Sequence, residues 1–447
     1  MQSSAEQIQG LETRLAAAMV LRAILTKKQG LDDFFAPEAS VVFLTRLAPR
    51  DRALARSIVT VALRRLGTIR AAIGQLLKTS LPRTASDLEW ILLVAGAQIL
   101  FLDVPDHASV DLAVRAARLD PKIAGFAPLV NGVLRNLIRE RQRILDEGDA
   151  LALDTPPWLA ERWQKTYGED TARAIARAHR NEPTLDISVR QDPLGWAQRL
   201  GARLLPTGSL RLESHAAISE LPGYVEGQWW VQDAAAALPA QLLAMTPGAR
   251  IADFCAAPGG KAAQLAARGA KVVAIDRSSS RMKRLEANFT RLQLEAEIVI
   301  ADALAVEMAP FDAILLDAPC SATGTIRRHP DIAWIKQPKD IVALADLQSR
   351  LLEKAATLLK PGGTLIYCTC SLEAEEGEDQ IAAFLARHGD FRRIPILASE
   401  VGGLNEIINP QGDLRMLPNH LQAQEPRFSG LDGFFVSRLT RLDTLPV

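Results

Sequence analysis

The sequence predicts a multidomain protein with an all-α helical bundle first, a small α+β module next and an α/β domain last. Two observations support this prediction. Apolar side chains recur at helical spacing through residues 1–140, whereas from residue 229 onward short apolar runs alternate with helical segments. The length of 447 residues also exceeds that of one ordinary domain. We therefore predict domains at 1–140, 141–228 and 229–447.

The composition is that of a globular chain, with 48% hydrophobic and 23% charged residues. The 52 basic residues balance the 52 acidic ones, so net charge identifies no partner, although the mild basic excess of residues 1–140 is compatible with nucleic acid. The apolar run Trp90–Leu102 is too short to cross a bilayer, and no secretory leader pattern begins the chain. We expect a cytoplasmic protein with no membrane partner.

Residues 1–140 are predicted to form short helices. Helical periodicity is found in Leu11–Leu25, Arg52–Leu77, Ala85–Leu102 and Ser109–Leu119. Arginines are interleaved with these segments, and both an RNA-binding surface and ordinary solvated helix faces would account for them. In the module at 141–228, Trp158–His179 is predicted to be helical and Thr184–Arg190 alternates like a strand. The sequence leaves the chemistry of this module open.

The C-terminal domain is predicted to contain a doubly wound, mainly parallel sheet. Its candidate strands are Ala249–Phe254, Lys271–Asp276, Ala296–Ile300, Ala313–Asp317, Gly363–Cys368 and Gly433–Arg438. A ligand is expected outside the carboxyl ends of such strands. The polar residues and turns of the domain follow these ends, at Cys255–Lys261, Asp276, Asp302, Asp317–Cys320 and Thr369–Cys370.

The segment Asp253–Lys261, with the sequence DFCAAPGGK, is typical of a strand, a tight turn and the start of a helix. Glycines allow a ligand close to the backbone, and free N–H groups at the helix start suit a polar or anionic group. Asp276 ends the next strand sixteen residues after Gly260, near the spacing at which α/β nucleotide sites bind ribose hydroxyls. Together these features predict a nucleotide-type site.

All four cysteines, Cys255, Cys320, Cys368 and Cys370, lie beyond residue 254, which does not suggest a disulfide framework. Cys320 and Cys370 follow neighbouring strands and can face one pocket. Each could be a small buried hydrophobic residue, but a strand-end position beside a carboxylate and a glycine-rich turn favours reactive thiols. Cys368 is expected to pack inside. The cysteines and scattered histidines lack the paired spacing of zinc ligands, so no metal is expected.

The sequences Asp253–Lys261, Asp317–Gly324 and Thr369–Ser371 resemble those of the NOL1/NOP2/Sun family of RNA 5-methylcytosine methyltransferases. The segments Asp51–Arg56 and Phe126–Arg135 resemble NusB-like helical domains, in which the fold serves RNA binding. The resemblance covers most of the chain and is most specific in the catalytic half. It implies a NusB-like front domain and a Rossmann-like, S-adenosylmethionine-dependent methyltransferase domain.

The family resemblance also implies the site residues. S-adenosyl-L-methionine would be bound by Cys255, Ala256, Ala257, Pro258, Gly259, Gly260, Lys261, Asp276, Asp302 and Asp317. Cys370 would be the nucleophile, Cys320 would assist product release, and Asp317 would hold the N3 and N4 edge of cytosine. DNA cytosine methyltransferases use their Pro-Cys cysteine as nucleophile, so the local motif alone does not assign the two roles. Asp302 could instead be a surface turn residue, and Lys261 could contact RNA phosphate.

The chemistry of cytosine methylation requires such residues. C5 is a poor nucleophile until a thiolate adds at C6, which makes covalent catalysis the expected route. The base must leave its stack, and Arg327, Arg328 and His329 follow Cys320 where they could meet phosphates, although a solvated basic turn would look similar. The helical front domain favours 16S ribosomal RNA of the small subunit as partner, and we expect a monomer. Transfer RNA, DNA and a non-catalytic NusB-like RNA-binding protein are the alternatives.

Overall fold

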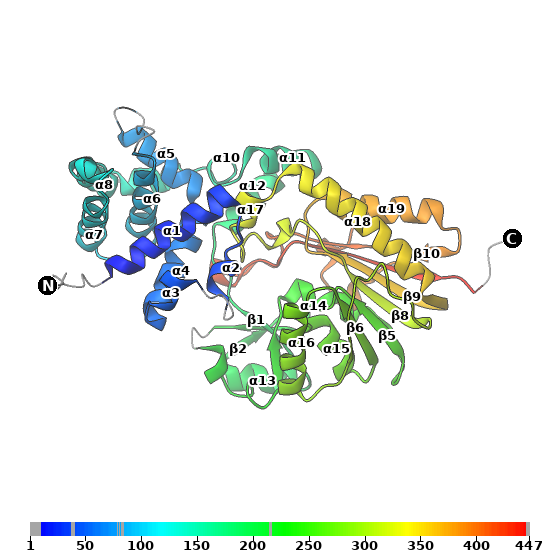
Figure 1. The fold of residues 1–447 in the computed structure, drawn as a ribbon. Coiled ribbons are helices and arrows are strands. Elements are labelled where there is room, and N and C mark those ends of the chain that lie inside the picture. Colours follow the sequence, from blue (N-terminus) through cyan, green and yellow to red (C-terminus); the bar gives the residue numbers. More distant parts are fainter. Residues whose placement is uncertain are drawn as a thin grey trace. The chain divides into compact units, whose positions relative to one another are not determined.

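The computed structural model describes residues 10–36, 41–77, 79, 81, 85–213 and 217–443, so residues 1–9 of the predicted helical domain lie outside the described part. Contacts divide the chain into two compact units (Figure 1). The helical unit comprises Met1–Arg180 and Ile326–Lys336, and the sheet unit comprises Asn181–Thr325 and Gln337–Val447. Among the described helices, none combines the length and apolar character that a membrane crossing needs.

The helical unit is a bundle built around one apolar helix, α6 (Asp87–Phe101), in which Leu88 and all ten residues of 91–100 are buried. The helix predicted at Ala85–Leu102 is therefore confirmed, and most of its apolar run is buried. The other helices of the bundle are α1 (Leu11–Lys27), α2 (Asp32–Phe35), α3 (Val42–Thr45), α4 (Pro49–Arg64), α5 (Leu66–Leu76), α7 (Asp106–Leu119) and α8 (Ala127–Arg139). The predicted helical character of this part is confirmed.

Four further helices, α9 (Arg141–Glu147), α10 (Ala150–Leu153), α11 (Pro157–Tyr167) and α12 (Glu169–His179), also belong to the helical unit. The single helix predicted from Trp158 to His179 is two helices, because Gly168 adopts a left-handed φ of 82° between them. Residues 141–180 thus group with the helices, and residues 181–228 group with the sheets. The exact domain limits at 140 and 228 stay predictions.

The segment Ile326–Lys336, which contains α17 (Ile332–Ile335), belongs to the helical unit although it follows a loop of the sheet unit. The backbone N–H of Leu31 donates to Asp331 Oδ2 at 3.0 Å, and the Trp334 indole Nε1 donates to the Leu63 carbonyl at 2.8 Å. Arg64 donates to the Arg327 carbonyl at 3.0 Å. These bonds anchor the segment to residues 263 to 300 positions earlier in the chain.

The sheet unit begins with a four-stranded antiparallel sheet in the order β2-β3-β1-β4, formed by β1 (Asp186–Val189), β2 (Ala202–Leu204), β3 (Leu210–Leu212) and β4 (Trp229–Val231), with helix α13 (Pro193–Leu200). The strand predicted at Thr184–Arg190 is confirmed as β1. Arg211 donates two hydrogen bonds to the Asp186 carboxylate, at 2.7 and 2.8 Å, and both side chains are buried. This paired geometry fastens β3 to β1.

The second sheet has eight strands, in the order β10-β12-β9-β8-β5-β6-β7 with β11 beside β12. Strands β5 to β9 pair in parallel and β12 is antiparallel to β9, as the prediction of a mainly parallel sheet requires. The strands are β5 (Arg250–Phe254), β6 (Lys271–Asp276), β7 (Glu297–Ile300), β8 (Phe311–Asp317), β9 (Leu359–Thr369), β10 (Phe391–Arg393), β11 (Leu414–Met416) and β12 (Phe434–Arg441). The strand predicted at Gly363–Cys368 lies within β9.

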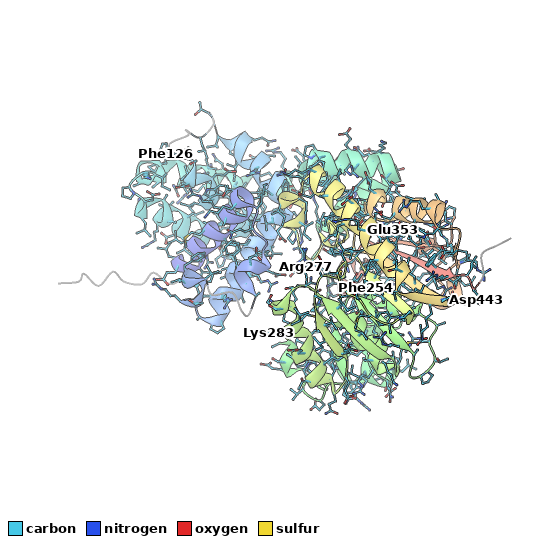
Figure 2. All side chains as sticks on the ribbon, turned by 45° about the vertical axis from the view of Figure 1, so that its right-hand side comes forward. Phe126, Phe254, Arg277, Lys283, Glu353 and Asp443 are labelled. Atoms are coloured by element: carbon cyan, nitrogen blue, oxygen red, sulfur yellow. The ribbon has the colours of Figure 1, made fainter. Side chains whose placement is uncertain are left out.

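Helices cover both faces of this sheet (Figure 1). One face packs against α14 (Ala234–Gln241), α15 (Gly260–Ala267) and α16 (Ser279–Leu292), and the other against α18 (Pro338–Thr357) and α19 (Glu378–Arg387). Along β5, Ile251 joins the first core and Ala252 the second, because successive side chains of a strand point to opposite faces. Phe254, at the end of β5, lies in the interior (Figure 2). The architecture is a doubly wound α/β domain.

Candidate active site

The predicted site residues of the sheet unit meet at the carboxyl ends of neighbouring strands. β5 lies between β6 and β8, and β9 is paired with the other side of β8. Cys255 follows β5, Asp276 ends β6, Asp317 ends β8, and Cys370 follows β9. Parallel pairing therefore brings four distant parts of the sequence to one edge of the sheet.

The turn between β5 and α15 requires special backbone conformations. Cys255 has a φ of 62° and Gly259 a φ of 103°, and a Cβ atom on Gly259 would lie 2.8 Å from Leu285 Cγ. Asp276 is buried, and its carboxylate accepts hydrogen bonds from the backbone N–H groups of Ala257, at 3.3 Å, and Ser278, at 2.9 Å. The end of β6 thus holds the turn in place.

The turn opens onto a cavity of about 290 Å³, whose lining includes Ala256, Pro258, Gly259, Gly260, Lys261 and Asp317. In the strand that leads into this turn, Asp253 is fully buried, and its carboxyl oxygens have no hydrogen-bond partner among the described residues. Burial first, and then the negative charge of Asp317, raise the pKa of Asp253 well above its usual range. A buried acid without a partner fits a site whose ligand supplies a donor or a positive charge.

Asp317 accepts a hydrogen bond from Lys261 Nζ at 2.7 Å on Oδ2 and one from the Cys368 thiol at 3.5 Å on Oδ1. Burial lowers the pKa of Lys261, but the Asp317 carboxylate opposes this effect, and the net pKa is raised. The ammonium group also lies 5.0 Å from the centre of the Phe434 ring. Lys261 is therefore a buried partner of Asp317, and Cys368 acquires a contact that the sequence did not indicate.

The sulfur atoms of Cys320 and Cys370 are 3.4 Å apart. The hydrogen bond with Cys370, followed by burial, raises the pKa of the Cys320 thiol well above its usual range. Either thiol can donate the hydrogen bond that joins the two sulfur atoms. Burial and then the charge of Asp317 raise the pKa of Cys255 to about 12, and the same two causes raise that of the interior Cys368. Of the four free thiols, Cys320 and Cys370 are the two whose sulfur atoms lie against each other at the strand ends.

Glu376 was not predicted, yet its carboxylate is fully buried beside both cysteine loops. In the sequence it is one of several acidic residues near Thr369–Ser371, and only its contacts with Ser321 and Ser371 in the folded chain distinguish it.

The other predicted site residues, Asp302 and the loop residues Arg327, Arg328 and His329, do not follow β5, β8 or β9 directly. Asp302 is exposed after β7 and accepts a hydrogen bond from the Leu304 N–H at 3.0 Å, which is the geometry of a local turn. Arg327, Arg328 and His329 belong to the helical unit. Arg327 is only 3% exposed, whereas Arg328 and His329 are partly exposed. The burial of Arg327 leaves Arg328 and His329 as the members of this loop that a phosphate can reach.

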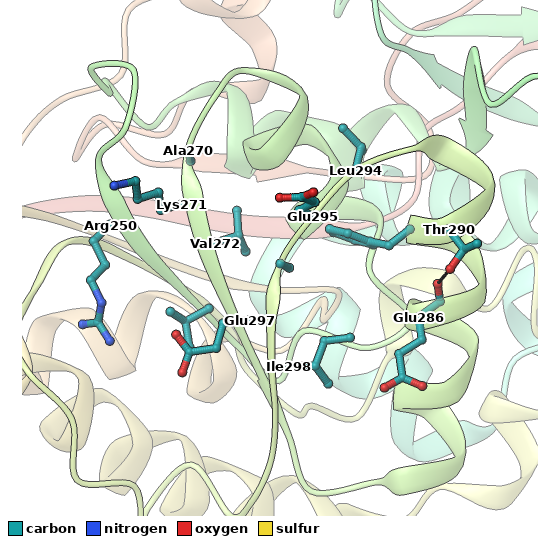
Figure 3. Close-up of a pocket in the computed structure, with 13 residues that line it drawn as sticks. Arg250, Ala270, Lys271, Val272, Glu286, Thr290, Leu294, Glu295, Glu297 and Ile298 are labelled. Atoms are coloured by element: carbon teal, nitrogen blue, oxygen red, sulfur yellow. Dashed lines mark hydrogen bonds between the residues drawn. The ribbon is translucent and has the colours of Figure 1, made fainter.

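A larger cavity, of about 740 Å³, lies at the opposite end of the same strands (Figure 3). Its lining includes Arg250, Lys271 and Glu297, the first residues of β5, β6 and β7, and no cysteine. Ligands of doubly wound sheets bind at the carboxyl ends, so we assign the site to the cysteine edge. Within the described ranges, no group of three or more His, Cys, Asp or Glu side chains is arranged to hold a metal ion.

The doubly wound sheet, the glycine-rich turn and the paired cysteines define a methyltransferase, here linked to a NusB-type bundle. Residues 240–440 match the family model of the 16S rRNA methyltransferase RsmB/F, and residues 11–139 match the NusB family. The chain belongs to the RsmB/F family of methyltransferases, which confirms the recognition from the cysteine motifs and the helical front domain.

Individual relatives agree with this assignment. Ribosomal RNA small subunit methyltransferase B of Xylella fastidiosa is 35% identical over 97% of this chain and 98% of that protein. The protein of the same name from Shewanella oneidensis is 36% identical over 76% of this chain and 83% of its own length. Among solved structures, a methyltransferase homolog protein from Pyrococcus horikoshii is 27% identical and has a TM-score of 0.54, covering 66% of this chain and 98% of that one.

Proposed function

We propose that the protein methylates C5 of a cytosine in 16S ribosomal RNA, with S-adenosylmethionine as methyl donor and a covalent bond between Cys370 and C6 of the base. The observation that carries this proposal is the 3.4 Å approach of Cys320 and Cys370 at strand ends next to Asp317. The names of the relatives support small-subunit ribosomal RNA as the substrate.

The residues at the strand ends fit the cofactor. The turn Cys255–Lys261 would cradle it, the buried Asp276 would accept the ribose hydroxyls, and Asp302 would lie near the adenine. The unpartnered carboxyl group of Asp253 suits the cationic amino acid end of such a molecule. When bound, S-adenosylmethionine supplies an electrophilic methyl group on a sulfonium sulfur.

The two cysteines would divide one difficult reaction into easier steps. Cys370 Sγ, as the thiolate, forms a bond to C6, and the electrons of the C5–C6 double bond move to C5, which becomes nucleophilic. Once C5 carries the methyl group, a base removes its proton, the C5–C6 double bond re-forms and the S–C6 bond breaks. The Cys320 thiol donates a hydrogen bond to the departing thiolate of Cys370 and so assists release.

Asp317 would orient the base. Its carboxylate can accept a hydrogen bond from the N4 amino group of cytosine while Lys261 and Cys368 hold its position from the protein side. A base reacting at C5 and C6 has to be unstacked, so the target is a single-stranded or flipped-out nucleotide.

Bisulfite sequencing of total RNA from cells with and without the gene tests the proposal. We expect one protected cytosine of 16S ribosomal RNA to lose its protection in the deletion strain and to regain it on complementation. Loss of protection in transfer RNA, with 16S ribosomal RNA unchanged, would establish the alternative substrate. Unchanged protection in all RNA would refute the activity.

A further inference from the structure

Glu376 lies at the end of the short 3-10 helix Ala374–Glu376 and is completely buried. Its carboxylate accepts hydrogen bonds from the Ser321 N–H at 2.9 Å, from the Ser321 hydroxyl and from the Ser371 hydroxyl at 2.5 Å. Ser321 directly follows Cys320, and Ser371 directly follows Cys370. One carboxylate therefore binds the residue next to each of the two cysteines.

A second buried side chain completes this arrangement. Gln348 of α18 donates from Nε2 to Glu376 Oε1 at 3.0 Å and to the Pro319 carbonyl at 2.8 Å. Together, Gln348 and Glu376 contact the residues on both sides of Cys320. The Tyr367 hydroxyl donates to the Glu376 carbonyl at 2.9 Å, which fixes the backbone that carries the carboxylate.

Burying a carboxylate has a free-energy cost that its hydrogen bonds have to offset. A buried carboxylate loses its hydration and is stabilised only by well-aligned donors, so Glu376 requires both cysteine loops to keep their present positions. The same hydrogen bonds hold both cysteine loops to a single group, the Glu376 carboxylate. Two thiols on separate loops stay 3.4 Å apart only if the loops cannot move independently.

We infer that Glu376 is a positioning residue that sets the separation of the Cys320 and Cys370 sulfur atoms by holding the residue after each. The catalytic meaning of this inference rests on the proposed cytosine methylation, since it is there that both thiols act on one base. Displacement of a reacting group by about 1 Å can slow a reaction roughly a hundredfold.

The test measures thiol geometry without RNA. Dibromobimane becomes fluorescent only after both of its arms have alkylated thiols, so its fluorescence rate reports the Cys320–Cys370 pair in the full chain. We expect Glu376→Gln to slow this reaction about tenfold or more. The glutamine NH₂ group is a donor, so it cannot accept the hydrogen bonds that the carboxylate now accepts from the Ser321 N–H and from the hydroxyls of Ser321 and Ser371. Asp379→Asn, which removes an exposed carboxylate three residues on, should react as the unmodified protein, and Cys370→Ala should give no signal.

A merely structural role would produce a different result. Glu376→Gln would then have a lower melting temperature but unchanged cross-linking in its folded state, and this outcome would overturn the inference. If Glu376→Gln does not fold, Ser321→Ala and Ser371→Ala each remove one hydroxyl donor and leave the carboxylate partly bound. Each should slow cross-linking about threefold or more. Unchanged rates in both serine variants would equally overturn the inference.

Single-turnover formation of the covalent RNA adduct provides the second measurement. Glu376→Gln should form adduct more slowly by a factor similar to that of cross-linking, with calorimetric affinity for S-adenosylmethionine within about twofold of the unmodified protein. If the unmodified protein forms no adduct with any RNA while Glu376→Gln still slows cross-linking, the proposed function fails and the positioning role stands. Equal adduct rates in the two proteins would refute the positioning role.

Discussion

Cys320 and Cys370 place their sulfur atoms 3.4 Å apart although 50 residues separate them in the chain. Two backbone hydrogen bonds bring the loops together, from the Ala318 N–H to the Cys368 carbonyl at 2.9 Å and from the Gly324 N–H to the Cys370 carbonyl at 3.0 Å. The parallel pairing of β8 with β9 and its continuation into the loops thus bring the two cysteines to one place, and the Glu376 carboxylate binds the residue after each of them.

The two cysteines should give opposite results when they are replaced. Cys370→Ala should lower methylation by more than about a thousandfold and abolish the RNA adduct, because the nucleophile is lost. Cys320→Ala should form the adduct and release it slowly, because the departing thiolate loses its hydrogen-bond donor. Electrophoresis of labelled RNA under denaturing conditions distinguishes the two. If Cys320→Ala runs free of RNA, the assignment of roles is wrong.

Strand ends were predictable because short apolar runs such as Arg250–Phe254 precede each polar turn, and parallel strands align their carboxyl ends. Position along β9 also explains why Cys368 could be assigned to the interior. The role of Glu376 was not predictable, since neighbouring acidic residues have the same local sequence character and only the tertiary fold brings the Glu376 carboxylate to Ser321 and Ser371.

The sequence likewise did not predict that Ile326–Lys336 belongs to the helical unit. Its partners Leu31 and Leu63 are 300 and 271 positions away from the residues they bind, and no periodicity reports such contacts. The three-residue strands β10 and β11 are too short for an alternating pattern to reveal them.

Asp276 provides a test of the cofactor site. Asp276→Asn keeps the shape of the side chain but removes the charge that would bind the ribose hydroxyls, so affinity for S-adenosylmethionine should fall about tenfold to a hundredfold. Calorimetric titration measures this directly. Asp346→Asn, on the exposed face of α18, is the matched control and should bind normally. An unchanged affinity in Asp276→Asn would exclude the site as proposed.

The loop after Cys320 should contribute unequally to RNA binding. Arg328 is partly exposed, so Arg328→Gln should weaken binding and reduce the slope of log affinity against log salt by about 0.7 to 0.9. Arg327 is buried, so Arg327→Gln should chiefly lower the melting temperature. Arg350→Gln, an exposed arginine of α18, serves as the control in a filter-binding series at several salt concentrations. An unaltered slope in Arg328→Gln would leave the loop without a phosphate contact.

His179 should make the stability of the protein depend on pH. It is 8% exposed and lies against Trp163, with the ring centres 5.3 Å apart. Burial, followed by the positive charges of Arg327 and Arg64, lowers its pKa from 6.5 to about 3. The unfolded chain therefore takes up the proton more readily than the folded chain. The associated stability is fully present above pH 6.5 and is lost as the pH falls toward 3.

The expected loss between pH 7 and pH 5 is about 2 kcal/mol, because each pH unit below 6.5 changes the free energy of unfolding by about 1.4 kcal/mol per proton. His179→Phe cannot bind that proton and should preserve the edge contact with Trp163, so its melting temperature should fall less over the same range. His107→Gln, at an exposed position of α7, should follow the unmodified protein. Scanning calorimetry at pH 7, 6 and 5 measures how the melting temperature of each of the three proteins changes with pH. If the melting temperatures of His179→Phe and the unmodified protein fall equally, another group is responsible for the acid lability.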